Sequence, residues 1–264
     1  MTKTFFLRLS MIAFAVLSIN VYAWGTTGHR VIAEVAENNL KASAKHKLKK
    51  IIGNQKLAYW ANWPDFIKSD TTGTWKHADV WHYVNIEPKG NLHDFTLALQ
   101  GQTGPNLYTE IKRLSSEMKN GNLSLEQKQI NLRFLIHLMG DLSQPMHVGR
   151  KEDLGGNLVR IKYFGQPTNL HSLWDSKLVD GNKYSYTEYA RVLDIRSKKD
   201  KKQLMSGTLE EWLYDGHKKA NTLYAYTKAD QNYYYGYGYR FDSLLEEQLY
   251  LGGLRLAKVL NEVL

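Results

Sequence analysis

The sequence predicts a mainly α-helical, single-domain protein with at most a short β-hairpin. Three observations predict this class. Apolar residues recur at helical spacing in several long segments, and only two short segments alternate in the manner of strands. The chain of 264 residues also contains no internal repeat and no linker of distinct composition. We therefore expect one substantial domain over residues 24–264.

The first two predicted helices cover residues 28–40 and 106–119. In each, apolar side chains return every three or four residues, which places them on one face of a helix. That face would be buried against the rest of the domain. Its members are Val31, Ile32, Val35, Ala36 and Leu40 in the first helix, and Leu107, Ile111, Leu114 and Met118 in the second.

A longer helix is predicted over residues 124–142. Ser124 stands three residues before Gln127, which is the spacing of a capping box at a helix start. The helix has a strongly apolar side that we expect to lie in the core. That side consists of Ile130, Phe134, Leu135, Leu138 and Leu142.

The last predicted helix spans residues 242–264, where Ser243 and Glu246 again have the spacing of a capping box. Leucines at helical spacing give it an apolar face. Strand-like patterns are scarce, and the best candidates are residues 80–86 and 157–164.

Two further segments have the composition of a surface. Residues 197–202 read SKKDKK, a charge run that predicts a solvated loop. Residues 232–240 read NYYYGYGYR, rich in tyrosine and glycine. Exposed aromatic side chains can stack on nucleobases. Core packing or a rigid loop also accounts for this composition, and the sequence alone leaves the choice open.

Residues 1–23 have the organisation of a secretory signal peptide. Lys3 and Arg8 supply a positive start, residues 9–19 are mostly apolar, and residues 21–23 end in the small residue Ala23. The apolar run is short for a membrane span, although an uncleaved anchor is the alternative reading. We expect export to the periplasm or the medium, with no membrane anchor after processing.

The charge and the cysteine count narrow the class of partner and of metal site. The formal net charge is +9, and it falls to +7 without the predicted signal peptide. A basic exported protein suggests a polyanionic partner such as nucleic acid, anionic lipid or a cell-surface polymer, although solubility alone explains it too. There are no cysteines, which excludes disulfides and thiolate ligands. A metal would be held by nitrogen and oxygen ligands, which suit zinc.

Two pairs of histidine and aspartate share one spacing. His137 and Asp141 are four residues apart on the predicted long helix, and so are His171 and Asp175. Residues four apart lie on the same helix face. His147 lies between the two pairs, just beyond the long helix. Carboxylates beside leucine and methionine would be costly to bury unless a cation compensates them. The pattern therefore predicts metal ligands.

More candidate ligands lie upstream. Asp65 stands in ANWPDFIK and His82 in VWHYVN, both among aromatic residues. If the signal peptide is removed, Trp24 becomes the first residue. Its free α-amine, with a pKa of about 8, could lose its proton to a metal, and its carbonyl could close a chelate ring. His29 follows closely enough to reach the same ion.

The remaining histidines give a weaker signal. His46, His93 and His217 lie in polar or loop-like stretches, and we expect them on the surface. His77 is ambiguous, because it lies near His82 in the stretch WKHADVWH.

Taken in order, these motifs identify a resemblance to the S1/P1 nuclease family, whose members are trinuclear zinc enzymes related to bacterial zinc phospholipase C. The resemblance covers essentially all of residues 24–264. It rests on Trp24 followed by His29, then on WPD, WHYVN, HLMGDLSQPMHV, GGN and NLHSLWD. The ordered set is far more specific than any one motif.

The resemblance implies three zinc ions and assigns each a set of ligands. Asp141 would bridge two of the ions. The sets are Asp65, His82, His137 and Asp141 for one ion; His147, His171 and Asp175 for the second; and Trp24, His29 and Asp141 for the third.

The resemblance also implies an endonuclease that hydrolyses single-stranded RNA and DNA to 5′-nucleotides, and many members also remove a 3′-phosphate from nucleotides. Asp65 would orient the attacking water as well as bind an ion, and Lys68 would stabilise the phosphate. Asn157 in GGN matches a phosphate-side or ligand-supporting asparagine. Tyr83 would stack a base. Asn85 stands where relatives can use Asp to bind a base edge, so base preference is open.

Two other functions stay possible on the sequence. A zinc phospholipase C shares the fold and the N-terminal tryptophan, but its relatives end the ligand series with Glu, where this chain has Asp175. An inactive relative that binds zinc or nucleotides is the second alternative, although all nine ligand positions are filled. We expect a monomer whose partners are single-stranded nucleic acids and nucleotides.

Overall fold

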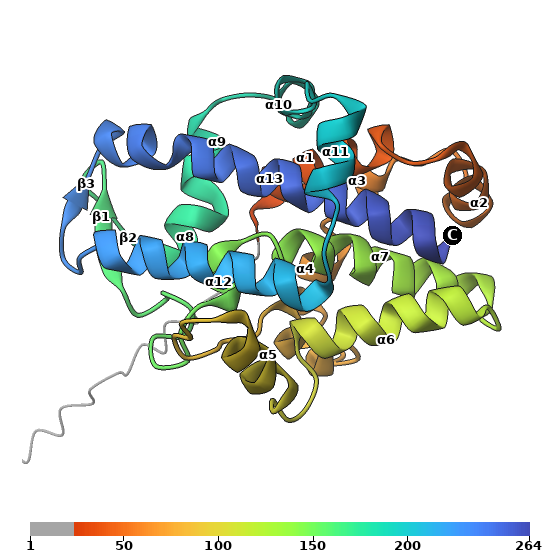
Figure 1. Ribbon diagram of the computed structural model, residues 1–264, viewed down its shortest axis with the longest axis horizontal. Coiled ribbons are helices and arrows are strands. Elements are labelled where there is room, and N and C mark those ends of the chain that lie inside the picture. The colour runs from red at the N-terminus through yellow and green to blue at the C-terminus, as the bar shows by residue number, and fades with distance from the viewer. Residues whose placement is uncertain (1–23) are drawn as a thin grey trace, which may run out of the picture.

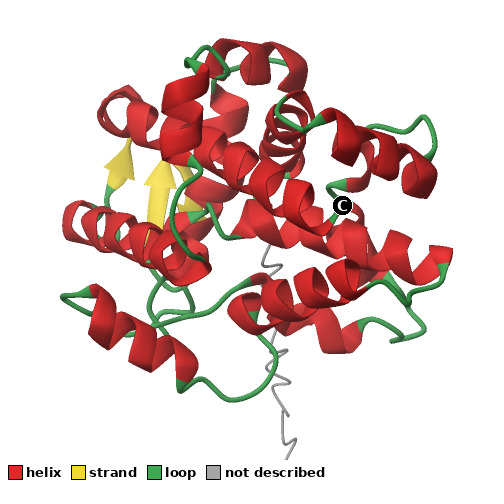
Figure 2. Cartoon of the chain, turned by 45° about the vertical axis from the view of Figure 1, so that its right-hand side comes forward, coloured by secondary structure: helices red, strands yellow, loops and turns green. Residues whose placement is uncertain are grey.

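The computed structural model describes residues 24–264, so the predicted signal peptide lies outside the described residues. Helices make up most of the molecule, and a small sheet occupies one side of it (Figures 1 and 2). The predicted mainly α, single-domain class is confirmed. Within the described residues, no helix combines the length and the apolar character needed to cross a membrane.

The helices follow one another with short connections. The α-helices are α1 (Thr26–Asn38), α2 (Ala42–Ile52), α3 (Leu57–Trp60), α4 (Trp63–Phe66), α5 (Leu92–Gln100), α6 (Leu107–Asn120), α7 (Leu125–Asp141), α8 (Leu170–Ser172), α9 (Leu178–Gly181), α10 (Tyr186–Leu193), α11 (Lys198–Leu204), α12 (Leu209–Tyr226) and α13 (Tyr235–Val263). Tighter or wider turns join some of them: η1 (Ile67–Ser69), η2 (Lys76–His82), η3 (Pro145–Val148) and the π-helical turn η4 (Leu173–Lys177).

The sheet has three short strands in the order β2-β1-β3. Strand β1 (Arg160–Tyr163) pairs antiparallel with β2 (Gln166–Asn169), and parallel with β3 (Asn232–Tyr233). The hairpin turn consists of Phe164 and Gly165, with φ of 50° and 76°. Two positive φ angles are what a tight two-residue hairpin requires. Strand β1 lies inside the strand candidate 157–164, and its pairing with β2 forms the one short hairpin expected; β3 adds a third strand that the sequence did not predict.

Helix α1 is the central element of the fold. It packs against α13, α10, α3 and α7, and Figure 1 shows it behind α13. Its predicted apolar face is buried, and the helix starts two residues before the predicted position 28. His29 lies on this buried helix, so the packing of α1 positions one of the candidate ligands.

The capping pattern correctly predicted the start of α7. The Ser124 side chain accepts a hydrogen bond from the Gln127 N–H, and the Gln127 side chain accepts one from the Ser124 N–H. Helix α6 begins with an equivalent box, in which Asn106 and Thr109 exchange hydrogen bonds. Reciprocal caps of this kind satisfy N–H groups that a helix start leaves without partners.

The predicted start of the last helix was wrong. Helix α13 begins at Tyr235, so Ser243 and Glu246 lie inside it and form no cap. Tyr237, Phe241 and Leu245 are buried at four-residue spacing. This apolar stripe extends the helix back through the glycines, because packing outweighs their low helix propensity.

Two other local predictions need correction. Residues 80–86 form no strand: the 3-10 turn η2 ends at His82, and an extended segment follows. There Val84 N–H donates to the His147 carbonyl at 2.8 Å. The charge run 197–202 is exposed as expected, but it forms helix α11 with Ser197 as its N-cap instead of a loop.

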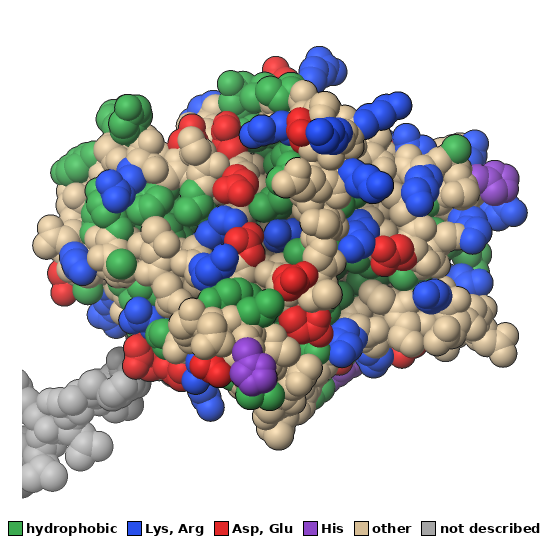
Figure 3. Space-filling model, viewed as in Figure 1, with side chains coloured by type: hydrophobic (Ala, Val, Ile, Leu, Met, Phe, Trp, Pro, Cys, Tyr) green, Lys and Arg blue, Asp and Glu red, His purple; other side chains and the backbone are tan. Residues whose placement is uncertain are grey.

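On the face seen in Figure 3, lysine and arginine side chains are spread among acidic ones. Independently of this view, some basic side chains of the described residues form ion pairs, for example Lys76 with Asp79 and Lys201 with Asp194. Net charge therefore supports solubility on this face at least as much as it supports a polyanion track.

Substitution of Gly253 by alanine should destabilise the protein. A Cβ there would stand 2.5 Å from Val35 Cβ and 3.0 Å from the Ile32 carbonyl on α1. Overpacking of this kind costs about 1–3 kcal/mol. Urea unfolding of Gly253→Ala would measure it.

Gly236 gives the matched control in the same helix, because no atom lies within 4 Å of a Cβ at that position. Gly236→Ala should leave stability unchanged or raise it by up to about 1 kcal/mol. Equal urea midpoints for Gly253→Ala and Gly236→Ala would contradict the close packing of α1 on α13.

Candidate metal centre

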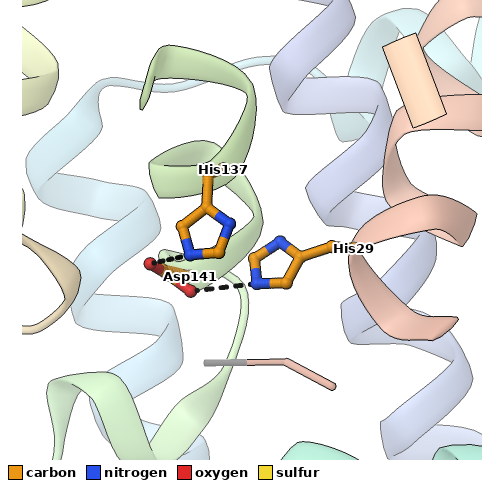
Figure 4. Close-up of side chains that lie close together, drawn as sticks. All are labelled: His29, His137 and Asp141. Carbon is orange, nitrogen blue, oxygen red and sulfur yellow. Dashed lines mark ion pairs between the residues drawn. The ribbon is translucent and has the colours of Figure 1, made fainter. Parts of the chain in front are cut away.

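The Asp141 carboxylate is fully buried at the end of α7, with a histidine pair facing each oxygen. Oδ1 lies 3.4 Å from His29 Nε2 and 3.5 Å from His147 Nδ1. Oδ2 lies 3.0 Å from His82 Nδ1 and 3.4 Å from His137 Nε2. Figure 4 shows His137 and Asp141 on one helix and His29 reaching them from α1. One carboxylate thus joins four histidines from four elements, α1, η2, α7 and η3.

Asp65 and Lys68 stand at the partly open edge of this cluster. Asp65 Oδ1 lies 3.7 Å from His137 Nε2, and the same nitrogen lies 3.0 Å from His82 Nδ1. Pro64 at the start of α4 suits the first turn of a helix, where no backbone donor is needed. Lys68, one turn beyond Asp65, donates to Asp65 Oδ1 at 2.7 Å.

A third group is formed by His147, His171 and Asp175. His147 Nε2 lies 3.7 Å from Asp175 Oδ1, and His171 Nε2 lies 3.2 Å from Asp175 Oδ2. His147 sits in η3, which starts at Pro145 directly after α7. Asp175 sits in the π-helical turn η4, a rare element that is frequent at functional sites.

Three histidine rings are fixed by backbone carbonyls on their outer side. Each Nδ1–H donates to a carbonyl, which leaves Nε2 with its lone pair toward the cluster. Such outer hydrogen bonds orient metal-binding histidines. The bonds, each 2.7 Å long, join His137 to Ala61, His147 to His82, and His171 to Gly155.

The protonation states of His137, His82 and Asp65 are those expected of metal ligands rather than of ion pairs between charged histidines and carboxylates. Burial lowers the pKa of His137 to about 3, so the ring is neutral near pH 7. Burial lowers the pKa of His82 as well, with the charge of Lys68 adding to the effect. Burial alone would raise the pKa of Asp65, but the neighbouring His137 and Lys68 outweigh it and bring that pKa to about 2. Neutral imidazoles beside ionised carboxylates are the forms that bind metal.

Several buried polar atoms of the cluster have no hydrogen-bond partner among the described residues. They are both ring nitrogens of His29, Oδ1 of Asp141 and Nε2 of His147. Leaving such atoms unsatisfied is costly, and a cation between them removes the cost. The donor set fits this: His29, His137 and Asp141 can converge on one ion, as can Asp65, His82 and His137, and also His147, His171 and Asp175. His137 belongs to two of these groups.

The backbone at Trp24 is held against the same cluster. The Trp24 side chain is fully buried, and its indole N–H donates to Ser143 Oγ at 3.0 Å. The Gly25 N–H donates to the Asp175 carbonyl at 2.6 Å. The indole therefore anchors Trp24, and the backbone of the next residue is bonded to that of the candidate ligand Asp175.

Two supporting residues were missed by the sequence analysis. Gln144 is fully buried, donates to Asp175 Oδ1 through its amide, and accepts from the Met146 N–H at 2.6 Å. Its position between Asp141 and His147 was the only available signal. Gly140 is the second: a Cβ there would stand 2.6 Å from His29 Nδ1, so the ring of His29 needs a glycine at this position.

The expectation of a surface position was wrong for His217. It is fully buried in α12, where Nδ1–H donates to the Val148 carbonyl at 3.0 Å and Nε2 accepts from the Lys89 N–H at 3.2 Å. It thus supports η3, which carries His147, from outside the cluster. His46 and His93 are exposed as expected, and His77 is an exposed residue against Trp75 and Trp81.

The candidate substrate-binding residues lie on the His82 and His171 side of the cluster. Tyr83 directly follows His82 and is half-buried, and the Asn85 Oδ1 is buried without a hydrogen-bond partner among the described residues. Asn157 is buried, and its amide donates to the Leu154 carbonyl at 2.9 Å. In the GGN loop it is Gly155, with φ of 64°, whose carbonyl holds His171.

The family comparison and the individual relatives agree that this chain is similar to nucleases. The model of a family described as S1/P1 Nuclease matches residues 24–264. Endonuclease 5 of Arabidopsis thaliana is 28% identical over 288 aligned positions, which cover 97% of both chains. Nuclease S1 of Aspergillus oryzae is 27% identical, covering 78% of this chain and 73% of its own. Nuclease P1 of Penicillium citrinum is 29% identical, covering 64% and 65%.

Acidification should destabilise the metal-free protein. Folded His137 takes up a proton only near pH 3, against 6.5 for its ordinary value. Between these values the unfolded chain binds more protons, so stability is fully present above pH 6.5 and is lost as the pH falls. Each such histidine contributes about 1.4 kcal/mol per pH unit.

Urea unfolding in chelator, measured from pH 6.5 down to about 4.5, would give this slope. The interval ends above 3.8, the ordinary pKa of Asp65, so that titration of this carboxylate contributes little. The free energy of unfolding should fall steadily. His137→Asn should reduce the slope by about one proton. A level or rising free energy of unfolding over this interval would contradict the burial of neutral histidines.

Proposed function

The chain belongs to the S1/P1 nuclease family, and we propose that it is a zinc-dependent endonuclease that hydrolyses phosphodiester bonds of single-stranded RNA and DNA to 5′-nucleotides. The observation that carries the proposal is the buried Asp141 carboxylate with a histidine pair at each oxygen. Removal of a 3′-phosphate from nucleotides is a second activity of the same site. Export through the segment at residues 1–23 belongs to the same proposal.

We assign three zinc ions to the cluster. The first would be held by Asp65, His82, His137 and Asp141, the second by His147, His171 and Asp175, and the third by Trp24, His29 and Asp141. Trp24 would contribute its amine and carbonyl once it is the first residue of the processed chain. The burial of its indole and the hydrogen bond from Gly25 to Asp175 support that position.

Zinc bound at this site would lower the pKa of water and would place positive charge against the phosphoryl group. The chain's own residues do the rest. The Asp65 carboxylate remains ionised near neutral pH and can accept a hydrogen bond from the attacking water, which aligns it with phosphorus. The Lys68 ammonium, held by Asp65 at 2.7 Å, supplies a point charge for a phosphoryl oxygen. Cleavage of the P–O3′ bond leaves a 5′-phosphate.

Recognition of the base is assigned to the His82 side of the cluster. Tyr83 offers an aromatic face for stacking, which accepts any base. Asn85 Oδ1, buried without a partner among the described residues, can accept from an exocyclic amino group. Single strands are preferred because their bases can leave the stack and lie on the protein.

Zinc-loaded protein starting at Trp24 should cleave single-stranded DNA and RNA, lose this activity in chelator, and leave phosphatidylcholine intact. Lys68→Ala should lower kcat by about 100-fold, because one preplaced charge on the phosphoryl group is lost. Gel assays of 5′-labelled oligonucleotides and a phosphocholine-release assay measure the two activities.

The matched control is Lys76→Ala. Lys76 pairs with Asp79 across the same three-residue spacing, but it is 81% exposed and outside the cluster. It should keep full activity. Hydrolysis of phosphatidylcholine in place of nucleic acid would favour the phospholipase reading, and binding of single strands without cleavage would favour the inactive relative.

Asp141→Asn should cost two of the three ions at once. An amide offers one neutral oxygen, so it cannot bridge, and the ion of His147, His171 and Asp175 should remain. Elemental analysis per chain and thermal unfolding would show the loss, because metal binding contributes to folding free energy. Asp79→Asn, at a half-buried surface carboxylate, is the control. Retention of the full zinc content by Asp141→Asn would refute the bridging role.

A further inference from the structure

An exposed phenylalanine directly follows the candidate ligand Asp65 in the chain, and most of its side chain lies in solvent rather than in the core. Phe66 ends helix α4 and is 70% exposed. Its neighbours on the same turn are used: Trp63 packs edge-on against Phe134 with ring centroids 5.5 Å apart, and Asp65 faces His137. A large apolar side chain left in water at a site that binds a ligand is a candidate contact residue.

Phe66 lines a hollow of about 390 Å³. This volume lies in the range of small-molecule sites, about 300–1,000 Å³. The other lining residues come from the start of α1, from α4 and η1, and from the region of η4 and α9. They are Gly25, Thr26, Thr27, Asn62, Asp65, Ser69, Ser176 and Asp180.

The walls of the hollow are the chain neighbours of candidate metal ligands. Gly25 follows Trp24, Phe66 follows Asp65, and Ser176 follows Asp175. Two of these walls touch each other: a Cβ at Gly25 would stand 2.6 Å from Ser176 Oγ. Asp65 itself lines the hollow. Whatever occupies this space therefore lies directly beside the reacting centre.

The chemistry of the lining favours a nucleoside over a phosphate. Hydroxyls from two threonines and two serines, and the amide of Asn62, can hydrogen-bond to a sugar or to a base edge. Asp180 is exposed there and adds a negative charge, which opposes a phosphate but can accept from an exocyclic amino group. Phe66 supplies a flat face for stacking.

The hollow is separate from the base site assigned to Tyr83. Its lining includes neither Tyr83 nor Asn85. Tyr83 continues the chain from His82, whereas Phe66 continues it from Asp65. A single strand whose scissile phosphate lies at the metal centre carries one nucleoside on each side of that phosphate, so two base sites are needed to hold both.

We propose that the hollow at Phe66 is a second nucleobase subsite, in which Phe66 stacks the base on the far side of the scissile phosphate from Tyr83. The inference rests on the proposed nuclease function. It assigns to Phe66 a share of the binding of single-stranded substrate, in addition to the stacking at Tyr83.

The test compares variants on three dinucleoside monophosphates: one with both bases, one abasic on the 5′ side, and one abasic on the 3′ side. Phe66→Ala should lower kcat/KM on the complete dinucleotide by about 5- to 150-fold, the usual value of one stacked base. Phe66→Trp should restore it. On one of the two abasic substrates, Phe66→Ala should equal the wild type, because the base that Phe66 contacts is missing.

Tyr59→Ala is the matched control, since Tyr59 is 71% exposed on the neighbouring helix α3 and does not line the hollow. It should behave as the wild type. Zinc content and melting temperature should be equal in all variants. An unchanged kcat/KM for Phe66→Ala on the complete dinucleotide, or the same loss on both abasic substrates, would overturn the proposal.

Binding separates this proposal from the nuclease function. A dinucleotide carrying the fluorescent base 2-aminopurine is quenched when that base stacks. If the zinc-loaded wild type cleaves nothing, the nuclease proposal fails, and the quenching titration still decides the subsite. A Kd weakened about 5- to 150-fold in Phe66→Ala supports it, and an unchanged Kd overturns it.

Discussion

The burial of one carboxylate governs the design of this protein. Asp141 is inaccessible to solvent, and its charge is faced by four imidazoles. Burial lowers the pKa of two of them, His137 and His82, which keeps these rings neutral near pH 7. A charge in such a place is strongly unfavourable unless a partner of opposite sign is present. Neutral rings cannot provide that partner, and Lys68 pairs with the outer carboxylate Asp65. A cation in the cluster would compensate the buried charge of Asp141. The stability of the core and the occupancy of the candidate metal site therefore depend on the same residues.

The rest of the fold can be understood as support for that cluster. Its candidate ligands come from separate elements, namely α1, α4, η2, α7, η3 and the η4 region. Only tertiary packing can bring these elements together. Backbone carbonyls fix three of the rings, Gln144 connects Asp175 with the turn before His147, and His217 supports that turn from α12. Because α1 carries His29, its tight packing on Gly252 and Gly253 of α13 belongs to the same support. The chain has no disulfide to share this task.

The sequence predicted what local physics determines and failed where distant packing decides. The start of α7 followed from Ser124 and Gln127, because a capping box involves only neighbouring residues. The start of α13 did not, because Tyr237 and Phe241 are held by partners such as Trp174 that lie far away in the chain. His217 was misplaced for the same reason.

The candidate site divides along the same line. Four-residue spacings identified His137 with Asp141 and His171 with Asp175, since a helix turn sets that geometry. The joining of these pairs through one carboxylate came only from the structure, as did Gln144, whose role depends on Asp175 in another turn. The sequence did not indicate that Phe66 is exposed, because the exposure of a single aromatic residue depends on tertiary packing and not on a local pattern. Family resemblance supplied the assignment of ligands to ions, which local spacing alone left open.

The charge at the centre also links metal occupancy to substrate binding. Asp65, Asp141 and Asp175 bring three negative charges together, while burial keeps His137 and His82 neutral. Lys68 offsets only one of those charges. A phosphodiester, itself an anion, would be repelled by such a site at short range, and the low dielectric of a buried cluster strengthens the repulsion. Divalent ions would reverse the sign of the local charge. Ions that compensate Asp141 would therefore also be the condition for attracting a phosphodiester. Surface lysines could not replace them, because solvent and salt screen their charge.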